Sequence, residues 1–190
     1  MKRIGLFFGT FNPVHTGHLI LAEYMLEYTD LEEIWFVVTP HNPAKNKKTL
    51  LPDRERLHMV NLAIEEREGL RASDVEFSLP QPNYTSQTLT FLRDQHPEKE
   101  FVLIMGEDNA NSLPKWRNCE SILDEHDVYT YPRMTDRKLT YEHPRVTKIN
   151  APILEISATA LRDAFRDGKR LTYLLPKAVF EYIEGSNLYH

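Results

Sequence analysis

This 190-residue chain has few cysteines, no long apolar run and no excess of basic residues. Cys119 is the only cysteine, so no disulfide can form within the chain and a reducing compartment is permitted. No apolar run approaches the roughly 20 residues that cross a bilayer. Acidic residues outnumber basic ones, 28 to 23, whereas nucleic-acid-binding surfaces usually carry a basic excess. We therefore expect neither nucleic acid nor a membrane as a partner.

The start of the chain also lacks the pattern of a signal peptide. Met1 to Arg3 lead into an apolar stretch of about five residues, shorter than the ~7 to 15 residues of a signal-peptide core. No small-residue cleavage site follows. The expected location is the cytoplasm.

No internal repeat, low-complexity segment or flexible linker divides the chain, so residues 1–190 are expected to form a single domain. Apolar stretches of strand length alternate with segments of helical period. The expected strands cover residues 3–8, 33–39, 75–79, 101–105, 128–131 and 153–156. The expected helices cover residues 18–28, 52–66, 85–95, 158–166 and 177–184. This alternation predicts an α/β fold with a doubly wound parallel sheet, which binds ligands at the carboxyl ends of its strands.

The stretch from Phe7 to Leu19, FFGTFNPVHTGHL, lies where the first expected strand gives way to the first expected helix. It matches neither of the common phosphate loops, GxxxxGK[ST] and GxGxxG. Its glycines permit a close approach to the backbone, and a helix N-terminus favours phosphate through unpaired N–H groups and a partial positive charge. His15 and His18 share a face if both fall on the first helical turn, and could then converge on one anion.

The histidine pair has two other interpretations, a metal site and a helix cap. HTGH lacks the spacing and the glutamate of a zinc-protease helix, and no third ligand stands nearby, so no metal site is predicted. One histidine could instead cap the helix while the other packs, although two imidazoles, two glycines and a proline exceed what a cap requires. Cys119 is interpreted as a partly buried apolar residue beside Ile122 rather than as a nucleophile.

Two motifs near opposite ends of the chain resemble those of a known family. GTFNPVHTGH, at residues 9–18, resembles the signature of the nucleotidyltransferases with an HxGH motif. ISATALR, at residues 156–162, is similar to the second ATP motif of the adenylyltransferase branch, ISxTxxR. The resemblance implies a Rossmann-like α/β sheet and the transfer of a nucleotide from ATP or CTP to a phosphorylated acceptor.

Further stretches narrow the resemblance to bacterial nicotinate mononucleotide adenylyltransferases. They are PNYTSQTL at 82–89, MGEDN at 105–109, NPAK at 42–45, RLHM at 56–59, and Trp116 followed by Ile122 and Leu123. The resemblance covers most of the chain. It implies that AMP from ATP is joined to nicotinate mononucleotide, giving deamido-NAD and pyrophosphate, a late step in NAD biosynthesis. ATP and nicotinate mononucleotide are then the expected partners, with Mg²⁺ carried by ATP because no dense carboxylate cluster is present.

The same resemblance assigns roles to individual residues. The expected catalytic residues are His15, His18, Lys45 and Arg162. The expected ATP-binding residues are Gly9, Thr10, Phe11, Gly17, Gly106, Asp108, Ser157 and Thr159. Thr85 is expected near the nicotinate carboxylate, and Trp116 is expected to stack on the pyridine ring. Asn12, Ala44 and Ala158 depart from the family pattern, which more often has aspartate, a bulkier residue and a second serine.

Three alternatives stay open from the sequence. Nicotinamide mononucleotide could replace the acid as acceptor, since the two differ by one charged group. A phosphopantetheine adenylyltransferase is expected to lack Trp116 and the 82–89 segment. A catalytically silent nucleotide-binding regulator could use the same fold, although retention of His15, His18, Lys45 and Arg162 argues against it. The sequence permits a homo-oligomer without indicating one.

Overall fold

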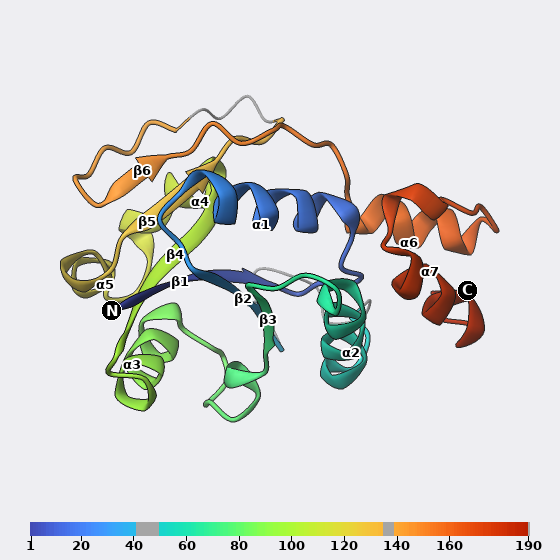
Figure 1. The fold of residues 1–190 in the computed structure, drawn as a ribbon, viewed down its shortest axis with the longest axis horizontal. Helices are drawn as coiled ribbons and strands as arrows, with labels where there is room; N and C mark the ends of the chain where they lie inside the picture. Colours follow the sequence, from blue (N-terminus) through green and yellow to red (C-terminus); the bar gives the residue numbers. More distant parts are fainter. Residues whose placement is uncertain (41–49, 135–138, 190) are drawn as a thin grey trace.

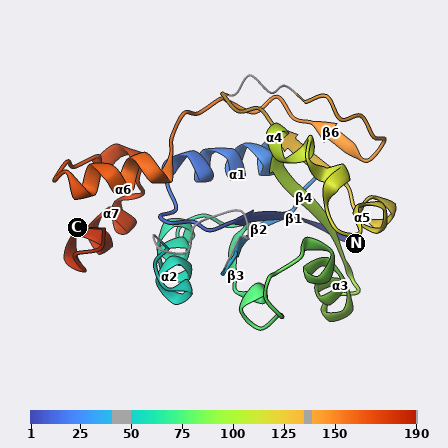
Figure 2. The same ribbon diagram turned by 180° about the vertical axis from the view of Figure 1, so that it is seen from behind.

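The structure is a computed structural model that describes residues 1–40, 50–134 and 139–189. Within these residues, six parallel strands form one sheet in the order β3-β2-β1-β4-β5-β6 (Figures 1 and 2). The strands are β1 (Lys2–Gly9), β2 (Glu33–Val38), β3 (Leu70–Ser73), β4 (Lys99–Gly106), β5 (Val128–Tyr131) and β6 (Val146–Lys148). The predicted α/β fold with a doubly wound parallel sheet is confirmed.

Helices connect the strands. They are α1 (Thr16–Tyr28), α2 (Asp53–Ile64), α3 (Thr85–Gln95), α4 (Glu107–Ala110), α5 (Cys119–Glu125), α6 (Ala158–Arg166) and α7 (Lys177–Gly185). Three short 3₁₀ segments accompany them: η2 (Val75–Phe77), η3 (Leu113–Lys115) and η4 (Thr172–Leu174). Both views place α6 and α7 beside the start of α1, away from β5 and β6 (Figures 1 and 2).

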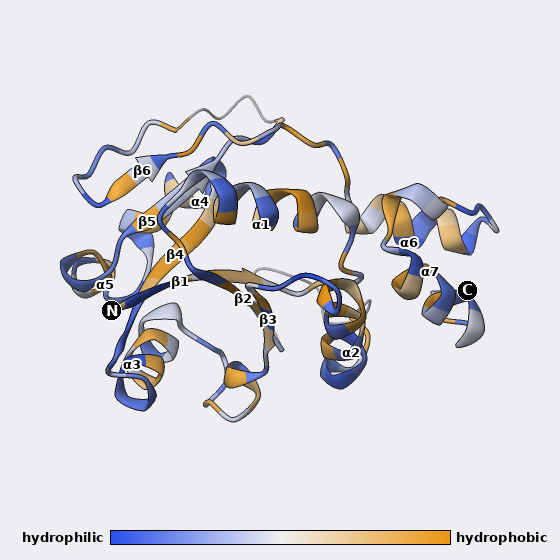
Figure 3. Ribbon diagram, in the orientation of Figure 1, coloured by the Kyte–Doolittle hydropathy of each residue, from blue (hydrophilic) through white to orange (hydrophobic). Residues whose placement is uncertain are grey.

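The central strands are apolar along their length because both faces of the sheet are covered. Successive side chains of a strand point to opposite faces, so Ile4 and Leu6 of β1 enter one core while Phe7 enters the other. The first core also contains side chains of α3 and α5, and the second contains side chains of α1, α2, α6 and α7. Figure 3 shows hydrophobic colour along β4, as expected for a strand covered on both faces.

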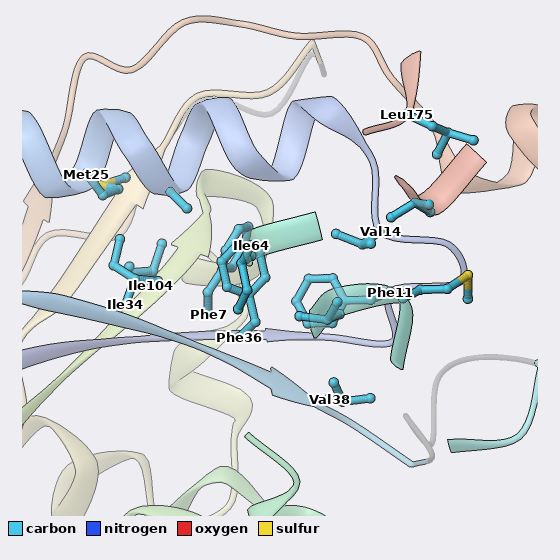
Figure 4. Close-up of a cluster of buried hydrophobic side chains, with 14 of the residues drawn as sticks. Phe7, Phe11, Val14, Met25, Ile34, Phe36, Val38, Ile64, Ile104 and Leu175 are labelled. Carbon is cyan, nitrogen blue, oxygen red and sulfur yellow. The ribbon is translucent and has the colours of Figure 1, made fainter. Parts of the chain in front are cut away.

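The core between α1 and the sheet reaches the loop that follows β1. Figure 4 shows Phe7, Phe11 and Phe36 gathered beneath α1. The Phe11 ring lies 6.0 Å from that of Phe7 and 5.4 Å from that of Phe36, between ring centroids, and the residue is 2% exposed. Phe11 has a φ of 44°, a left-handed conformation that is uncommon outside glycine. The loop after β1 is therefore anchored in the core by an aromatic side chain.

The strand order reverses between β1 and β4. The chain builds outward from β1 through β2 to β3, then returns to pair β4 with the other edge of β1 and builds outward again. In open α/β sheets, ligands bind at the carboxyl ends of the strands at such a reversal. Gly9 ends β1 and Gly106 ends β4. This topology therefore predicts a ligand site beside these two glycines.

Two predicted strands were wrong. Residues 75–79 alternate apolar and polar side chains, but Val75–Phe77 form a 3₁₀ turn, and the strand lies earlier, at Leu70–Ser73. Residues 153–156 pair with no strand, and Ile153 is 54% exposed. The last strand is instead Val146–Lys148. Both true strands are short, outermost in the sheet and partly polar, so they lack the apolar pattern that marks the central strands.

Candidate active site

The two histidines of HTGH meet at the start of α1. His15 is the N-cap residue and His18 lies in the first turn, since α1 begins at Thr16, two residues before the expected start at residue 18. The backbone N–H of His15 donates to Nδ1 of His18 at 3.2 Å, which closes the helix end. The rings nevertheless stack, with centroids 3.6 Å apart and planes 24° apart. The pair therefore caps the helix and also presents two imidazoles on one side.

The imidazole of His18 is fixed in position. Its Nδ1 accepts a backbone N–H and carries no proton, so the ring hydrogen resides on Nε2. The ring also packs edge-on against Phe7 and Phe11, with centroids 5.9 and 5.1 Å away. These contacts leave His18 as an oriented N–H donor.

His15 has a different electrostatic character. It is 7% exposed, and burial, together with the nearby Arg133 guanidinium, lowers its pKa to about 4. His15 is therefore neutral at physiological pH. A phosphate brought beside it would favour the protonated form, because an opposite charge raises the pKa of an imidazole.

A cavity of about 1140 Å³ opens at the reversal between β1 and β4. Most of the residues expected in the site line it: His15, His18, Arg162, Gly9, Thr10, Phe11, Gly17, Asp108, Ser157, Thr159, Thr85 and Trp116. Gly106 is not among the lining residues, and Lys45 lies outside the described part of the chain. Segments about 150 residues apart in sequence thus share one cavity, while the individual roles stay predictions.

Arg162 is held against the loop that follows β1. Helix α6 begins after Ser157, whose Oγ accepts the N–H of Ala160 at 3.4 Å, as expected for an N-cap. From the first turns of α6, Arg162 Nη1 donates to the carbonyl of Asn12 at 2.7 Å, and Nη2 donates to Thr159 Oγ1 at 3.2 Å. The guanidinium therefore lies beside the backbone of the loop after β1 with a fixed orientation.

Gly106 acts by leaving space. A Cβ at this position would lie 2.6 Å from Oδ1 of Asp108 and 2.7 Å from Nε of Arg133. These two residues form an ion pair, with Nη1 and Oδ2 3.5 Å apart, and both line the cavity. The sequence analysis missed Arg133. Its position just after β5, at the carboxyl edge of the sheet, was the available signal.

Glu76 is a second residue that the sequence analysis missed. It is 2% exposed, lines the cavity, and accepts the Thr88 hydroxyl at 2.9 Å through Oε1. Burial raises the pKa of this carboxyl group, and hydrogen bonds from Thr88 and Thr39 partly offset the effect. The incorrect strand prediction over residues 75–79 concealed it, because a strand would have placed Glu76 opposite the apolar side chains.

The wall formed by α3 and η3 is more open. Thr85 is the first residue of α3, so its N–H is one of the amides without a partner inside the helix. Trp116 is partly buried and its Nε1 donates to Ser112 Oγ at 3.2 Å. The guanidinium of Arg117 lies 4.8 Å from the centroid of the Tyr84 ring. This wall offers an aromatic face, a cation and a backbone donor.

Within residues 1–40, 50–134 and 139–189, no three His, Cys, Asp or Glu side chains gather closely enough to hold a metal ion. In the same residues, no helix has the length and apolar character needed to cross a membrane.

Comparison with known proteins places these features in context. The cytidylyltransferase-like family profile matches residues 6–164. A probable nicotinate-nucleotide adenylyltransferase of Flavobacterium johnsoniae is 53% identical over 190 residues, covering 98% of both chains. The Bacteroides fragilis protein of the same description is 45% identical over 184 residues, covering 95% of this chain and 90% of its own.

Solved structures share the fold. Plasmodium falciparum nicotinic acid mononucleotide adenylyltransferase, complexed with NaAD, superposes with a TM-score of 0.82 at 20% identity. The match covers 100% of this chain and 98% of that one. A putative nicotinate-nucleotide adenylyltransferase from Vibrio parahaemolyticus superposes with a TM-score of 0.74 at 20% identity. This match covers 100% of this chain and 96% of that one. At this identity the likeness concerns the fold.

Proposed function

The chain belongs to the cytidylyltransferase-like family, and on that premise we propose that it transfers the AMP part of ATP to nicotinate mononucleotide in NAD biosynthesis. The products are deamido-NAD and pyrophosphate. The relatives named for this activity match nearly the whole chain. The structural observation that supports the proposal is the stacked imidazole pair at the start of α1, in a cavity shared with Arg162.

The reaction brings two anionic groups together. An oxygen of the acceptor 5′-phosphate attacks the α-phosphorus of ATP and forms the new P–O bond, while the bond to the pyrophosphate oxygen breaks. No covalent nucleophile is needed, because positioning and charge stabilisation carry this kind of transfer. The site therefore has to supply oriented donors and positive charge.

His18 is the main donor in this mechanism. Its Nε2–H reaches an α-phosphate oxygen, and Nδ1 keeps the ring oriented through the His15 backbone. His15 binds neighbouring phosphate oxygens, whose negative charge raises its pKa against the opposing effects of burial and of Arg133. The N-terminus of α1 adds its partial positive charge.

The remaining ATP contacts come from both ends of the chain. Arg162 supplies fixed charge to the phosphates, and Lys45 joins it from the segment outside the described residues. Gly9, Thr10, Phe11 and Gly17 bring the loop backbone close to the phosphates. Asp108, Ser157 and Thr159 hold the ATP nucleoside and its phosphates, and Gly106 leaves room for the Asp108 side chain.

The acceptor occupies the wall formed by α3 and η3. Trp116 stacks on the cationic pyridine ring, which suits an aromatic face both by area and by charge. Thr85 donates to the nicotinate carboxylate from the first turn of α3. This wall is where acid and amide acceptors are distinguished.

Mg²⁺ would be carried by the triphosphate, where it would keep several of its waters and neutralise part of the phosphate charge. We further infer that residues 1–190 form one domain and that the protein works in the cytoplasm, where ATP and pyridine nucleotides meet.

Pyrophosphate release tests the proposal. The assay uses ATP and Mg²⁺ with either nicotinate mononucleotide or nicotinamide mononucleotide under identical conditions, and phosphopantetheine as a third acceptor. A strong preference for the acid is expected. Preference for the amide would move the protein to the nicotinamide branch. ATP-dependent thermal stabilisation without release from any acceptor would instead indicate a silent nucleotide-binding protein.

A further inference from the structure

Asn12, the position that departs from the family's usual aspartate, is a junction between distant segments. It is 2% exposed, and its backbone carbonyl accepts Arg162 Nη1 at 2.7 Å. Its side-chain Oδ1 accepts the backbone N–H of Leu51 at 3.3 Å and the hydroxyl of Tyr189 at 2.7 Å. One residue of the phosphate loop is thus bound from α6, from the chain before α2 and from the chain after α7.

Tyr189 is firmly placed for this contact. After α7, Asn187 and Tyr189 both adopt left-handed backbone conformations, with φ of 51° and 69°, and Leu188 N–H donates to the Ile183 carbonyl at 3.2 Å. Such conformations persist where surrounding contacts impose them. The Tyr189 ring stacks on Phe165 of α6, with centroids 6.2 Å apart. The turn therefore sends the phenol back toward the loop after β1.

The phenol of Tyr189 lies near the charges of Arg162 and Arg56. Burial raises the pKa of Tyr189, and the charges of Arg162 and Arg56 partly offset this. Arg56 is fully buried and donates to the carbonyls of Leu51 at 3.0 Å and Thr39 at 2.9 Å. It also donates to the carbonyl of Thr10 at 2.5 Å. The hydroxyl therefore completes a layer of hydrogen bonds behind the loop backbone.

We propose that Tyr189 is a positioning residue for ATP, acting through Asn12 to hold the phosphate loop and Arg162 in their binding geometry. The inference rests on the ATP site described above. Without the hydroxyl, Oδ1 of Asn12 loses its 2.7 Å hydrogen bond, which is shorter than the 3.3 Å bond from Leu51, and the Asn12 carbonyl can shift away from Arg162. The effect falls on the phosphates and leaves the acceptor wall, formed by α3 and η3, unchanged.

The test compares Tyr189→Phe with Tyr182→Phe. Both variants lose one hydroxyl near α7 and keep the ring; the Tyr182 hydroxyl donates to Glu55, and Tyr182 does not line the cavity. ATP affinity is measured by titration calorimetry with Mg²⁺, and KM for both substrates is measured by pyrophosphate release. Tyr189→Phe should raise the Kd and KM for ATP about fivefold, the scale of one neutral hydrogen bond, with the KM for nicotinate mononucleotide unchanged. Tyr182→Phe should match the wild type.

A double-mutant cycle with Asn12→Ala provides a second readout. If the hydroxyl acts through Asn12, the double variant should bind ATP no more weakly than Asn12→Ala alone. Additive losses would overturn the proposal, as would an unchanged ATP affinity in Tyr189→Phe or an equal loss in Tyr182→Phe. If the wild type binds ATP without turnover, the acceptor assignment fails while the binding comparison still decides this inference. A wild type that binds no ATP overturns both.

Discussion

We assign the ATP phosphates to one wall of the cavity, the phosphate wall (His15, His18 and Arg162), and the acceptor to another, the acceptor wall formed by α3 and η3. The two walls are built differently. On the phosphate wall, His15 is 7% exposed, His18 is held by a backbone donor and two phenylalanine rings, and Arg162 is bonded to a backbone carbonyl. On the acceptor wall, Trp116 has one hydrogen bond to a serine, and Arg117 lies over Tyr84. The side chains of the phosphate wall are therefore held in position more tightly than those of the acceptor wall.

This difference suggests that the phosphate wall serves the chemical step and the acceptor wall serves substrate binding. A transition state that concentrates charge gains most from donors that need no reorganisation, which requires buried and restrained groups. Recognition of one acceptor ring needs area and a few polar contacts. Substitutions in the phosphate wall should therefore lower turnover, and substitutions in the acceptor wall should weaken binding of one substrate.

The largest expected effect comes from His18→Ala. Loss of an oriented donor to the transition state should lower kcat about 10²- to 10³-fold, since it acts where charge develops. Circular dichroism and thermal unfolding should show a folded protein. His58→Ala removes an exposed histidine of α2 that lies outside the cavity and serves as the control. Turnover of His18→Ala near the wild-type rate would contradict the mechanism.

Arg162→Ala should lower kcat/KM for ATP by about 10- to 100-fold, the range expected for losing charge-assisted hydrogen bonds to phosphate. The matched control is Arg166→Ala on the same helix, whose exposed guanidinium pairs with Asp163 at 2.7 Å. Equal losses in the two variants would show a general effect on α6. A lysine at 162 should recover only part of the loss, because it lacks the planar fork of arginine.

The buried His15 makes stability depend on pH. Its pKa is about 4 in the folded protein against 6.5 ordinarily, so the unfolded chain binds a proton first as the pH falls. This stability is fully present well above pH 6.5 and should decrease by about 1.6 kcal/mol between pH 6.5 and 5, a factor of roughly 15 in the folding equilibrium. Urea unfolding of wild type and His15→Gln at both pH values measures this difference.

Between pH 6.5 and 5, the free energy of unfolding of His15→Gln should decrease less than that of the wild type, and the difference should equal this amount. The pKa of His126, also lowered by burial, contributes equally to both proteins and cancels. Identical slopes in the two proteins would mean that His15 is not a buried neutral imidazole.

Trp116→Ala should have the smallest effect of the four. Loss of ring stacking should raise KM for nicotinate mononucleotide about tenfold and leave KM for ATP unchanged, and Trp116→Phe should recover most of the affinity. Steady-state kinetics with each substrate varied in turn measures both constants. An equal rise in both constants would assign Trp116 to general packing and would remove the contrast between the two walls.

Sequence reasoning was strongest where one physical signal dominated. The continuous apolar pattern located β1, β2 and β4, because a strand covered on both faces must be apolar throughout. It failed for β3 and β6, whose short, partly polar sequences resemble loops. Pairing with the neighbouring strand determines these two elements, and pairing leaves little trace in local composition.

The same distinction applies to the site. His15, His18 and Arg162 were found because they belong to motifs at a strand-to-helix turn and a helix start. Arg133 and Glu76 were missed because each reaches the cavity from a segment with no motif of its own. The contact between Tyr189 and Asn12 joins residues 177 positions apart, and only the folded chain brings them together.

Phe11 links the loop after β1 to the interior of the protein. Its backbone belongs to that loop, while its ring packs on Phe7 and Phe36. Stability engineering of this protein is therefore not independent of activity engineering. A repacked core around Phe36 that raises the melting temperature can still displace the loop by a fraction of an ångström and slow the enzyme. Screens for thermostable variants should retain these three rings and instead search the core on the other face of the sheet, around α5 and Leu92 of α3.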